Sequence, residues 1–178
     1  NPSKGFYNEE RLLKFSRDLV EWNFNKDFIL SENWLFEFII DCWISMTIEI
    51  SNGVVFTNCP SLQIIEGGSF TNSNIGPLVI NTLTGLTNIG NVGDNWGPFD
   101  SAGICGELNL TGLNALTTIG TYAFYDNNIS SVDFTGLTAL TTIDDYAFAL
   151  NSISSVDFSG LTALTTIGEG AFASNNIS

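Results

Sequence analysis

Apolar residues recur at a fixed spacing from residue 51 onward. The segment 132–148, VDFTGLTALTTIDDYAF, returns at 156–172 as VDFSGLTALTTIGEGAF, and an altered copy occupies 108–124. The leucine that opens each Leu-Thr-Thr-Ile stretch recurs with a period of 24. Two earlier leucines with changed neighbours extend the series to Leu62, Leu86, Leu116, Leu140 and Leu164. The spacing predicts five units, 51–74, 75–104, 105–128, 129–152 and 153–176, with a truncated sixth that begins at Ile177.

This period predicts a solenoid, in which each unit forms one coil and buries its apolar side only against the coils above and below. A large apolar side chain contributes about 1.5–3 kcal/mol when it is buried, so the stack itself must form the core. Val132 and Phe134 alternate with Asp133 as in a short strand, and stacked coils would pair such strands into a parallel sheet. The expected inward positions of unit 129–152 are Ile129, Val132, Phe134, Leu137, Leu140, Ile143, Ala147 and Phe148.

The first half of the unit resembles a leucine-rich repeat. Ile129, Val132 and Phe134 match its L-x-x-L-x-L start, although Leu137 stands where most such repeats have Asn or Cys. The second half resembles the BspA-like leucine-rich repeats of bacterial and protist surface proteins, whose L-x-x-I-x-x-x-A-F segment is matched by Leu116, Ile119, Ala123 and Phe124.

The resemblance covers residues 51–178 and is weaker in the first two units, where Ser69-Phe70 replaces Ala-Phe and the second unit is interrupted. It implies a leucine-rich-repeat solenoid that acts in adhesion or ligand capture at a cell surface, and it supplies no catalytic residues. The fold class expected here is therefore a parallel β-strand stack of 24-residue coils with an N-terminal, mostly helical cap.

Residues 1–50 do not follow the repeat. Residues 8–22 have the pattern of a helix with Asn8 as its cap, a second helix is predicted at 31–43, and residues 44–50 alternate like a strand. Because a solenoid needs its first coil covered, a cap is favoured over an independent functional domain. The unfinished coil after Ile177 leads us to expect a longer natural protein.

Composition excludes several classes of function. All five basic residues lie in the first 26 positions, so the repeats cannot neutralise nucleic-acid phosphates or anionic lipid headgroups. The chain has no histidine, which removes Ser-His-Asp and Cys-His catalysis and His-ligated metal sites. The most apolar window, 34–48, carries Glu37 and Asp41, which argues against membrane insertion.

An outward ladder along the predicted strands is the first candidate site. Asn109, Asp133 and Asp157 occupy the same position in successive coils, so they are predicted to lie above one another. A bound cation would relieve the repulsion between the two carboxylates, about 0.8 kcal/mol at 5 Å in water. Calcium needs six or more oxygens, however, so a solvated acidic face is favoured and no cofactor is expected. Ser131 and Ser155 belong to the same candidate face.

An insertion, residues 90–103, is the second candidate. Phe99 is predicted to replace the Phe of the Ala-Phe pair, which leaves Asp94, Asn95 and Trp96 on a protruding loop. Exposed Trp is a favoured anchor for a partner. The alternative is a tolerated insertion whose Trp folds back on its own coil.

Threonine pairs at 117/118, 141/142 and 165/166 form a further repeated feature, which suits a flat ice- or glycan-binding array but also an ordinary strand. Cys59 and Cys105 fall at predicted inward positions and are expected to act as small buried hydrophobes, while Cys42 lies in the cap. Three Asn-x-Ser/Thr triplets, at Asn109, Asn128 and Asn176, are expected to be chance matches.

The sequence therefore predicts a non-enzymatic, extracellular or cell-surface module that binds a protein or glycan ligand. A structural spacer that displays another domain is the competing class, and a threonine array is the third. The array predicts identical outward residues on every coil, yet the first two units carry Gln63-Ile64 and Thr87-Asn88 in place of the Thr pair.

Overall fold

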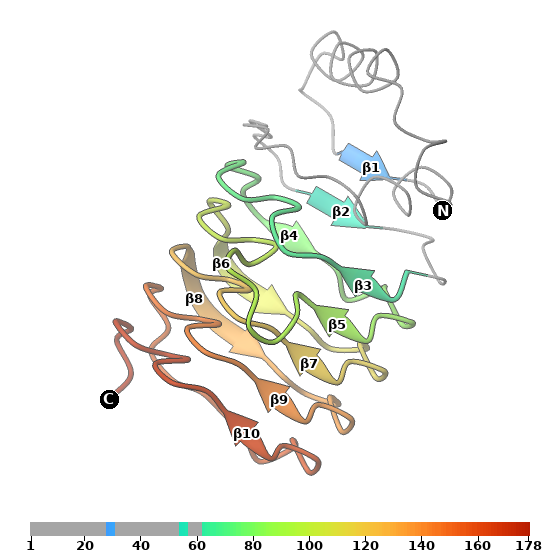
Figure 1. Cartoon of the computed structure of the whole chain (residues 1–178), viewed down its shortest axis with the longest axis vertical. Helices are drawn as coiled ribbons and strands as arrows, with labels where there is room; N and C mark the ends of the chain where they lie inside the picture. The colour runs from blue at the N-terminus through green and yellow to red at the C-terminus, as the bar shows by residue number, and fades with distance from the viewer. Residues whose placement is uncertain (1–27, 31–53, 57–61) are drawn as a thin grey trace, which may run out of the picture.

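The chain winds into a β-solenoid whose coils follow the predicted repeat and stack along one axis (Figure 1). The computed structural model describes residues 28–30, 54–56 and 62–178. The predicted solenoid and its parallel strand stacks are thus confirmed over these residues. The predicted helices at 8–22 and 31–43, the strand at 44–50, and Cys42 and Cys59 lie outside the described residues.

Parallel strands form on the predicted side of the coils as far as β8, whereas the equivalent segment of the last unit, residues 153–158, forms no strand. Three of them pair in the order β1-β2-β4, and two longer ones pair as β6-β8. Their bounds are β1 Phe28–Leu30, β2 Val54–Phe56, β4 Leu78–Val79, β6 Cys105–Asn109 and β8 Asn128–Asp133. β1 was not predicted, and it provides a parallel neighbour for β2 ahead of the first predicted unit.

A second parallel sheet, also not predicted, lies on another side of the coils. It uses two residues from each Leu-Thr-Thr-Ile stretch or its equivalent, in the strand order β10-β9-β7-β5-β3. Its strands are β3 Ile64–Ile65, β5 Asn88–Ile89, β7 Thr118–Ile119, β9 Thr142–Ile143 and β10 Thr166–Ile167. The second residue of each pair is an Ile that aligns with the Ile of the coils above and below. The spacing of the apolar residues in the sequence therefore sets the register of this sheet.

The core lies between these sheets and consists of columns of identical positions. All eight predicted inward residues of unit 129–152 are buried except Val132, which packs against the core while partly exposed. One column is aromatic: five rings stack with centroids 5.2–5.3 Å apart and nearly parallel planes, namely Phe70, Phe99, Phe124, Phe148 and Phe172. Phe99 therefore takes the predicted place in the column despite the insertion.

Cys105 does not fill the inward position that was predicted for it. Ile104 is 1% exposed and occupies that place, while Cys105 is half-buried with a free thiol. The reason is an extra residue in this coil: three residues separate Ile104 from Leu108, against two between Ile129 and Val132.

A column of asparagine amides closes one corner of the last three coils. The Asn151 side chain accepts a hydrogen bond at 3.0 Å from the N–H of Ile129, which begins the same unit, and donates to the Phe124 carbonyl of the preceding unit at 2.9 Å. Asn127 and Asn175 make the equivalent contacts with Ile104 and Ile153. These asparagines therefore bind consecutive coils to one another, a role beyond the turn formation expected from the sequence.

Two positions in the coil have a left-handed backbone. The residue two places after the column Phe has φ between 51° and 58° in five coils, as Asn72, Ser101, Asp126, Leu150 and Ser174. The residue two places before it is Gly68 or Gly170 in two coils, but Tyr122 and Tyr146, with φ of 56° and 54°, in two others. A left-handed backbone costs a non-glycine residue about 1–2 kcal/mol, so Tyr122 and Tyr146 each lower the stability of the fold by about this amount relative to an unstrained residue.

Candidate functional site

The strand ladder has the predicted column of polar side chains, and each of these side chains stabilises its own turn. Asp133 and Asp157 accept a hydrogen bond from the N–H two residues later, at 2.9 Å from Thr135 and 2.8 Å from Ser159. Asn109 does the same with Thr111. This is the Asx-turn arrangement, which explains why Asn and Asp interchange at this position.

Hydrogen bonding also sets the ionisation of the two carboxylates. The pKa of Asp133 lies below its usual value because the Thr135 side chain and N–H donate to the charged form. The pKa of Asp157 is lowered mainly by the Ser159 N–H. Both groups are therefore anionic at neutral pH, with one oxygen of each engaged in the turn.

The two serines of this face lie beside the ladder. Ser131 is half-buried on β8 and pairs in register with Glu107 of β6, whereas Ser155 is exposed on the following coil. Within the described ranges, no three His, Cys, Asp or Glu residues gather closely enough to hold a metal ion.

The threonine columns use their hydroxyls within the scaffold. Thr117 Oγ1 donates to the Thr87 carbonyl at 3.0 Å, and Thr141 and Thr165 repeat the contact one and two coils further on. Each of these hydroxyls therefore donates its proton to the neighbouring coil, and the first Thr of each pair can offer an external lattice only acceptor lone pairs.

The insertion loop, residues 90–103, folds as a tight turn that is attached to the next coils. Asp94 accepts the Asn91 N–H at 2.9 Å and closes the turn. The Gly93 N–H donates to Thr121 Oγ1 at 2.7 Å and to Asp144 at 3.2 Å, so the loop is bound to two coils beyond its own.

Trp96 remains open to solvent at the end of this turn. Its side chain is 60% exposed, and Asn95 beside it is exposed as well, while Asp94 is half-buried. The main chain after it lies close to the third coil, because a Cβ on Gly97 would be 1.8 Å from the Tyr122 carbonyl oxygen. The loop thus presents Trp96 from an attached backbone, and the alternative of a Trp folded back on its own coil does not hold.

A tyrosine cluster next to this loop was missed in the sequence. Tyr122 and Tyr146 stack with centroids 5.5 Å apart, and Tyr125 meets Tyr122 edge-on at 5.2 Å. All three rings are partly exposed. The signal that was available is the recurrence of Tyr at the same place in two successive units, where other units have a small or polar residue. We call Trp96, Tyr122, Tyr125 and Tyr146 the aromatic face.

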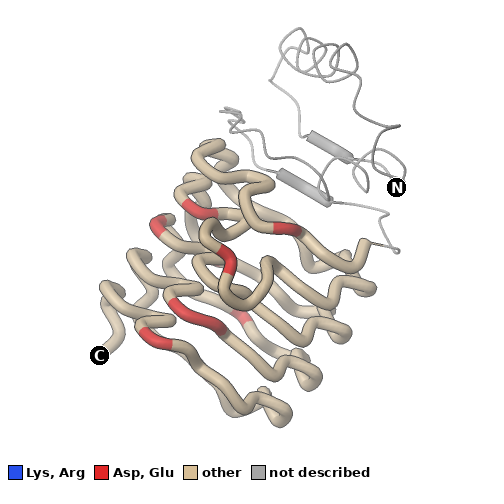
Figure 2. The backbone as a smooth tube through the Cα atoms, viewed as in Figure 1, with Lys and Arg blue, Asp and Glu red and all other residues tan. Residues whose placement is uncertain are grey.

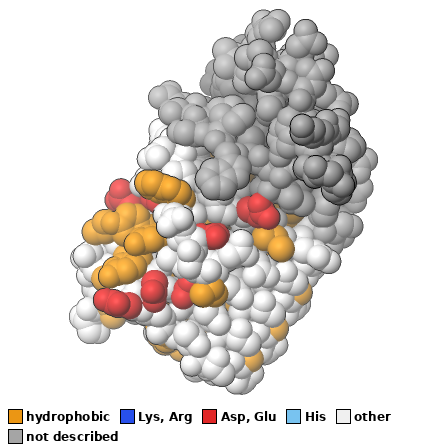
Figure 3. Space-filling view, viewed as in Figure 1, with side chains coloured by type: hydrophobic (Ala, Val, Ile, Leu, Met, Phe, Trp, Pro, Cys, Tyr) orange, Lys and Arg blue, Asp and Glu red, His pale blue; other side chains and the backbone are white. Residues whose placement is uncertain are grey.

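Acidic groups border the aromatic face. The pKa of Tyr146 is raised above its usual value, mainly by the negative charge of Glu169 and further by burial and by Asp145. Figure 3 shows hydrophobic side chains, a class that includes Tyr and Trp, gathered on this side of the molecule with acidic side chains on either side of them. Residues 62–178 contain no Lys or Arg, so the charges in Figure 2 are all negative.

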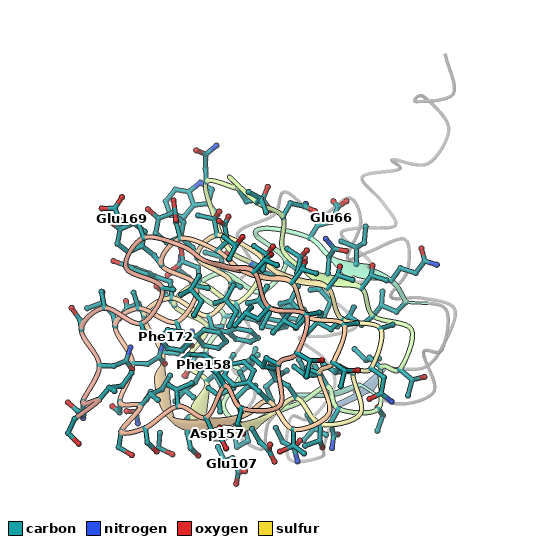
Figure 4. All side chains as sticks on the ribbon, turned by 90° about the horizontal axis from the view of Figure 1, so that it is seen from below. Glu66, Glu107, Asp157, Phe158, Glu169 and Phe172 are labelled. Carbon is teal, nitrogen blue, oxygen red and sulfur yellow. The ribbon has the colours of Figure 1, made fainter. Side chains whose placement is uncertain are left out.

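The structure separates the sequence-predicted site residues into two opposite surfaces. In Figure 4, Glu169 lies on one side of the coils and Glu107 and Asp157 on the other, with Phe158 and Phe172 between them. The strand face comprises Asn109, Ser131, Asp133, Ser155 and Asp157, all on or following β6 and β8. Asp94, Asn95 and Trp96 belong instead with the aromatic face, because the loop binds Thr121 and Asp144.

The fold is a β-solenoid of stacked coils with two opposite exposed surfaces, the strand face and the aromatic face. Comparison with known families gives one match: residues 105–178 match the model described as "BspA type Leucine rich repeat region (6 copies)", as the resemblance of these units predicted. No curated protein and no solved structure matches the chain. Among the described residues, no helix is both long and apolar enough to cross a bilayer.

Proposed function

We propose that the chain is a non-enzymatic binding and adhesion module of a secreted or cell-surface protein, with a protein or glycan as its ligand. The family match supports binding, because leucine-rich repeats of this type generally act as protein-binding modules. The observation that carries the proposal is the 60% exposure of Trp96 on a loop attached to a rigid stack of coils. Such anchors on rigid scaffolds are favoured in recognition.

The insertion loop and the aromatic face form the first contact surface in this proposal. Asp94, Asn95 and Trp96 contribute the loop side of it. The strand face, with Asn109, Ser131, Asp133, Ser155 and Asp157, is a second surface, on which each acidic side chain keeps one oxygen outside its turn. We expect no cofactor, and calcium is included below as a variable because of the Asp pair.

Two other functions remain in competition. A spacer requires only the scaffold and would tolerate any change on either face. An ice- or glycan-binding array requires free hydroxyls in register, and the donation of Thr117, Thr141 and Thr165 to backbone carbonyls counts against it.

A binding screen tests the proposal directly. The purified full chain is immobilised and exposed to extracellular-matrix proteins and a glycan array, with calcium and with chelator. We expect saturable binding of a partner that weakens on Trp96→Ala without a change in melting temperature. A correctly folded chain that binds nothing in either condition would favour the spacer. A melting temperature unchanged by calcium would remove the Asp ladder as a metal site.

A further inference from the structure

We propose that the aromatic face binds a lysine- and arginine-rich segment of a partner protein, an inference that rests on the proposed binding function and assigns its partner class. Trp96, Tyr122, Tyr125 and Tyr146 supply the rings, and Asp145 and Glu169 supply the charge beside them. The opposite strand face has carboxylates but no aromatic side chain among its five residues.

The backbone conformation of Tyr122 and Tyr146 is the first argument. Both tyrosines have a positive φ at a position that is glycine in two other coils, Gly68 and Gly170. The scaffold therefore accepts glycine at this position, and tyrosine is the more strained choice. Strained residues that persist in a fold tend to mark functional sites. Here the strain places two stacked rings on the surface, next to the loop that carries Trp96.

The charge beside these rings is the second argument. The Glu169 N–H donates to Asp145 at 2.6 Å, which brings the two acidic residues of adjacent coils together beside Tyr146. Residues 62–178 contain no cation that pairs with these carboxylates. Glu169 lies close enough to the Tyr146 phenol for its negative charge to raise the pKa of that phenol.

Rings and carboxylates together select the chemistry of the occupant. A Lys or Arg head over a ring face gains a cation–π interaction, and the same head gains an ion pair with a carboxylate at the edge. An acidic partner or a nucleic acid would meet only negative charge on this face. A neutral glycan would use the rings but gain nothing from Asp145 and Glu169. A basic peptide segment is the occupant that uses both features.

Binding of a fluorescein-labelled peptide of alternating Arg and Ser to the full chain tests this, with a Gln-Ser peptide as the uncharged control. Tyr146→Gly removes a ring and gives the residue found at the same position in other coils, so the fold is retained. We expect its Kd for the Arg peptide to rise about two- to fivefold. Trp96→Ala is a second ring variant with a similar expected rise. Circular dichroism melting of each variant reports folding independently.

Glu169→Gln and Glu107→Gln form a matched pair of charge variants. Each removes one negative charge from an exposed Glu, and the two residues lie on opposite faces (Figure 4). Long-range attraction changes equally in both, so only a local contact distinguishes them. We expect Glu169→Gln to raise the Kd about twofold or more and Glu107→Gln to leave it unchanged.

Each outcome decides between this inference and another account. If Glu169→Gln and Glu107→Gln weakened binding of the Arg peptide equally and Tyr146→Gly had no effect, the net negative charge of the chain would explain the binding, and the inference would be overturned. Binding of neutral oligosaccharides but not of the Arg peptide would overturn it in favour of a glycan site. A partner found by the screen whose affinity is unchanged by Tyr146→Gly and Glu169→Gln would overturn it while leaving the proposed binding function intact.

Discussion

Replacing Asn151 by Ala should destabilise the solenoid severely, because the side chain satisfies buried backbone groups of two coils. The Ile129 N–H loses its acceptor at 3.0 Å and the Phe124 carbonyl loses a donor at 2.9 Å. An unsatisfied buried group costs about 1–3 kcal/mol, so the two together cost about 2–6 kcal/mol. The loss is larger than surface substitutions produce, and the cavity from a small polar side chain adds little.

Urea unfolding followed by circular dichroism measures this change. With an m-value of about 2–3 kcal/mol per M, the midpoint should fall by about 0.7–3 M. Asn128→Ala is the matched control: Asn128 is exposed, and its side chain accepts one hydrogen bond from the Ser152 hydroxyl at 3.0 Å. Its cost should stay within about 0.5 kcal/mol. A midpoint for Asn151→Ala equal to that of Asn128→Ala would refute the role assigned to the asparagine column.

The variant Asn151→Asp tests separately the two roles of the Asn151 side chain, as an acceptor for the Ile129 N–H and as a donor to carbonyl oxygens. The carboxylate keeps an acceptor for the Ile129 N–H, but it loses the donors that reach the Phe124, Phe148 and Ala149 carbonyls. A negative charge then faces carbonyl oxygens, so this variant should be less stable than wild type at neutral pH and should recover part of the loss at acidic pH, where the protonated group again donates. A loss that does not change with pH would contradict this account.

Three further predictions concern single positions. Phe124→Ala, at a fully buried ring in the middle of the aromatic column, should cost about 3–5 kcal/mol in urea unfolding. Leu150→Asn, at an exposed residue with φ of 55°, should raise stability by about 0.5–1 kcal/mol, seen as a higher melting temperature, since Asn tolerates this conformation and Leu does not. The pKa of Asp133 in the folded chain lies below 3.8, so the ionised group stabilises the fold above pH 3.8, and this contribution is lost as the pH falls through the folded pKa. Asp133→Asn keeps the acceptor of the turn but has no group that titrates there. Its melting temperature should therefore fall less between pH 5 and pH 2 than that of wild type.

The period and the inward residues were predictable because a stacked coil must place the same side chain on its own copy. Phe124 and Phe148 are a clear case: they stack at 5.2 Å, and they hold the same place in two successive units of the sequence. The place of Phe99 followed from the same requirement, since the aromatic column has to continue across the insertion.

The second sheet was not predictable from alternation. Its strands are two residues long, as in Thr118–Ile119, and a two-residue strand has no period to detect. The role of Asn151 was missed for a related reason: Asn is an ordinary turn residue, and only the structure shows its amide between two coils.

The sequence did not predict that the candidate site residues lie on two opposite surfaces, because their positions within the repeating unit were not compared with one another. Trp96 belongs to the aromatic face and Asp133 to the strand face, and Figure 4 shows Glu169 and Asp157, which lie beside these two faces, on opposite sides of the coils. The aromatic face was overlooked because Tyr122 and Tyr146 precede Ala-Phe pairs, which drew attention to the core positions of the same segment.

Amide hydrogen exchange of the full chain with and without the Arg peptide, or with a partner from the screen, tests the central claim most directly. If the aromatic face is the contact surface, exchange should slow at residues 91–97, 121–126 and 145–147. Slowed exchange confined to residues 107–109 and 131–133 would move the contact to the strand face and contradict the account.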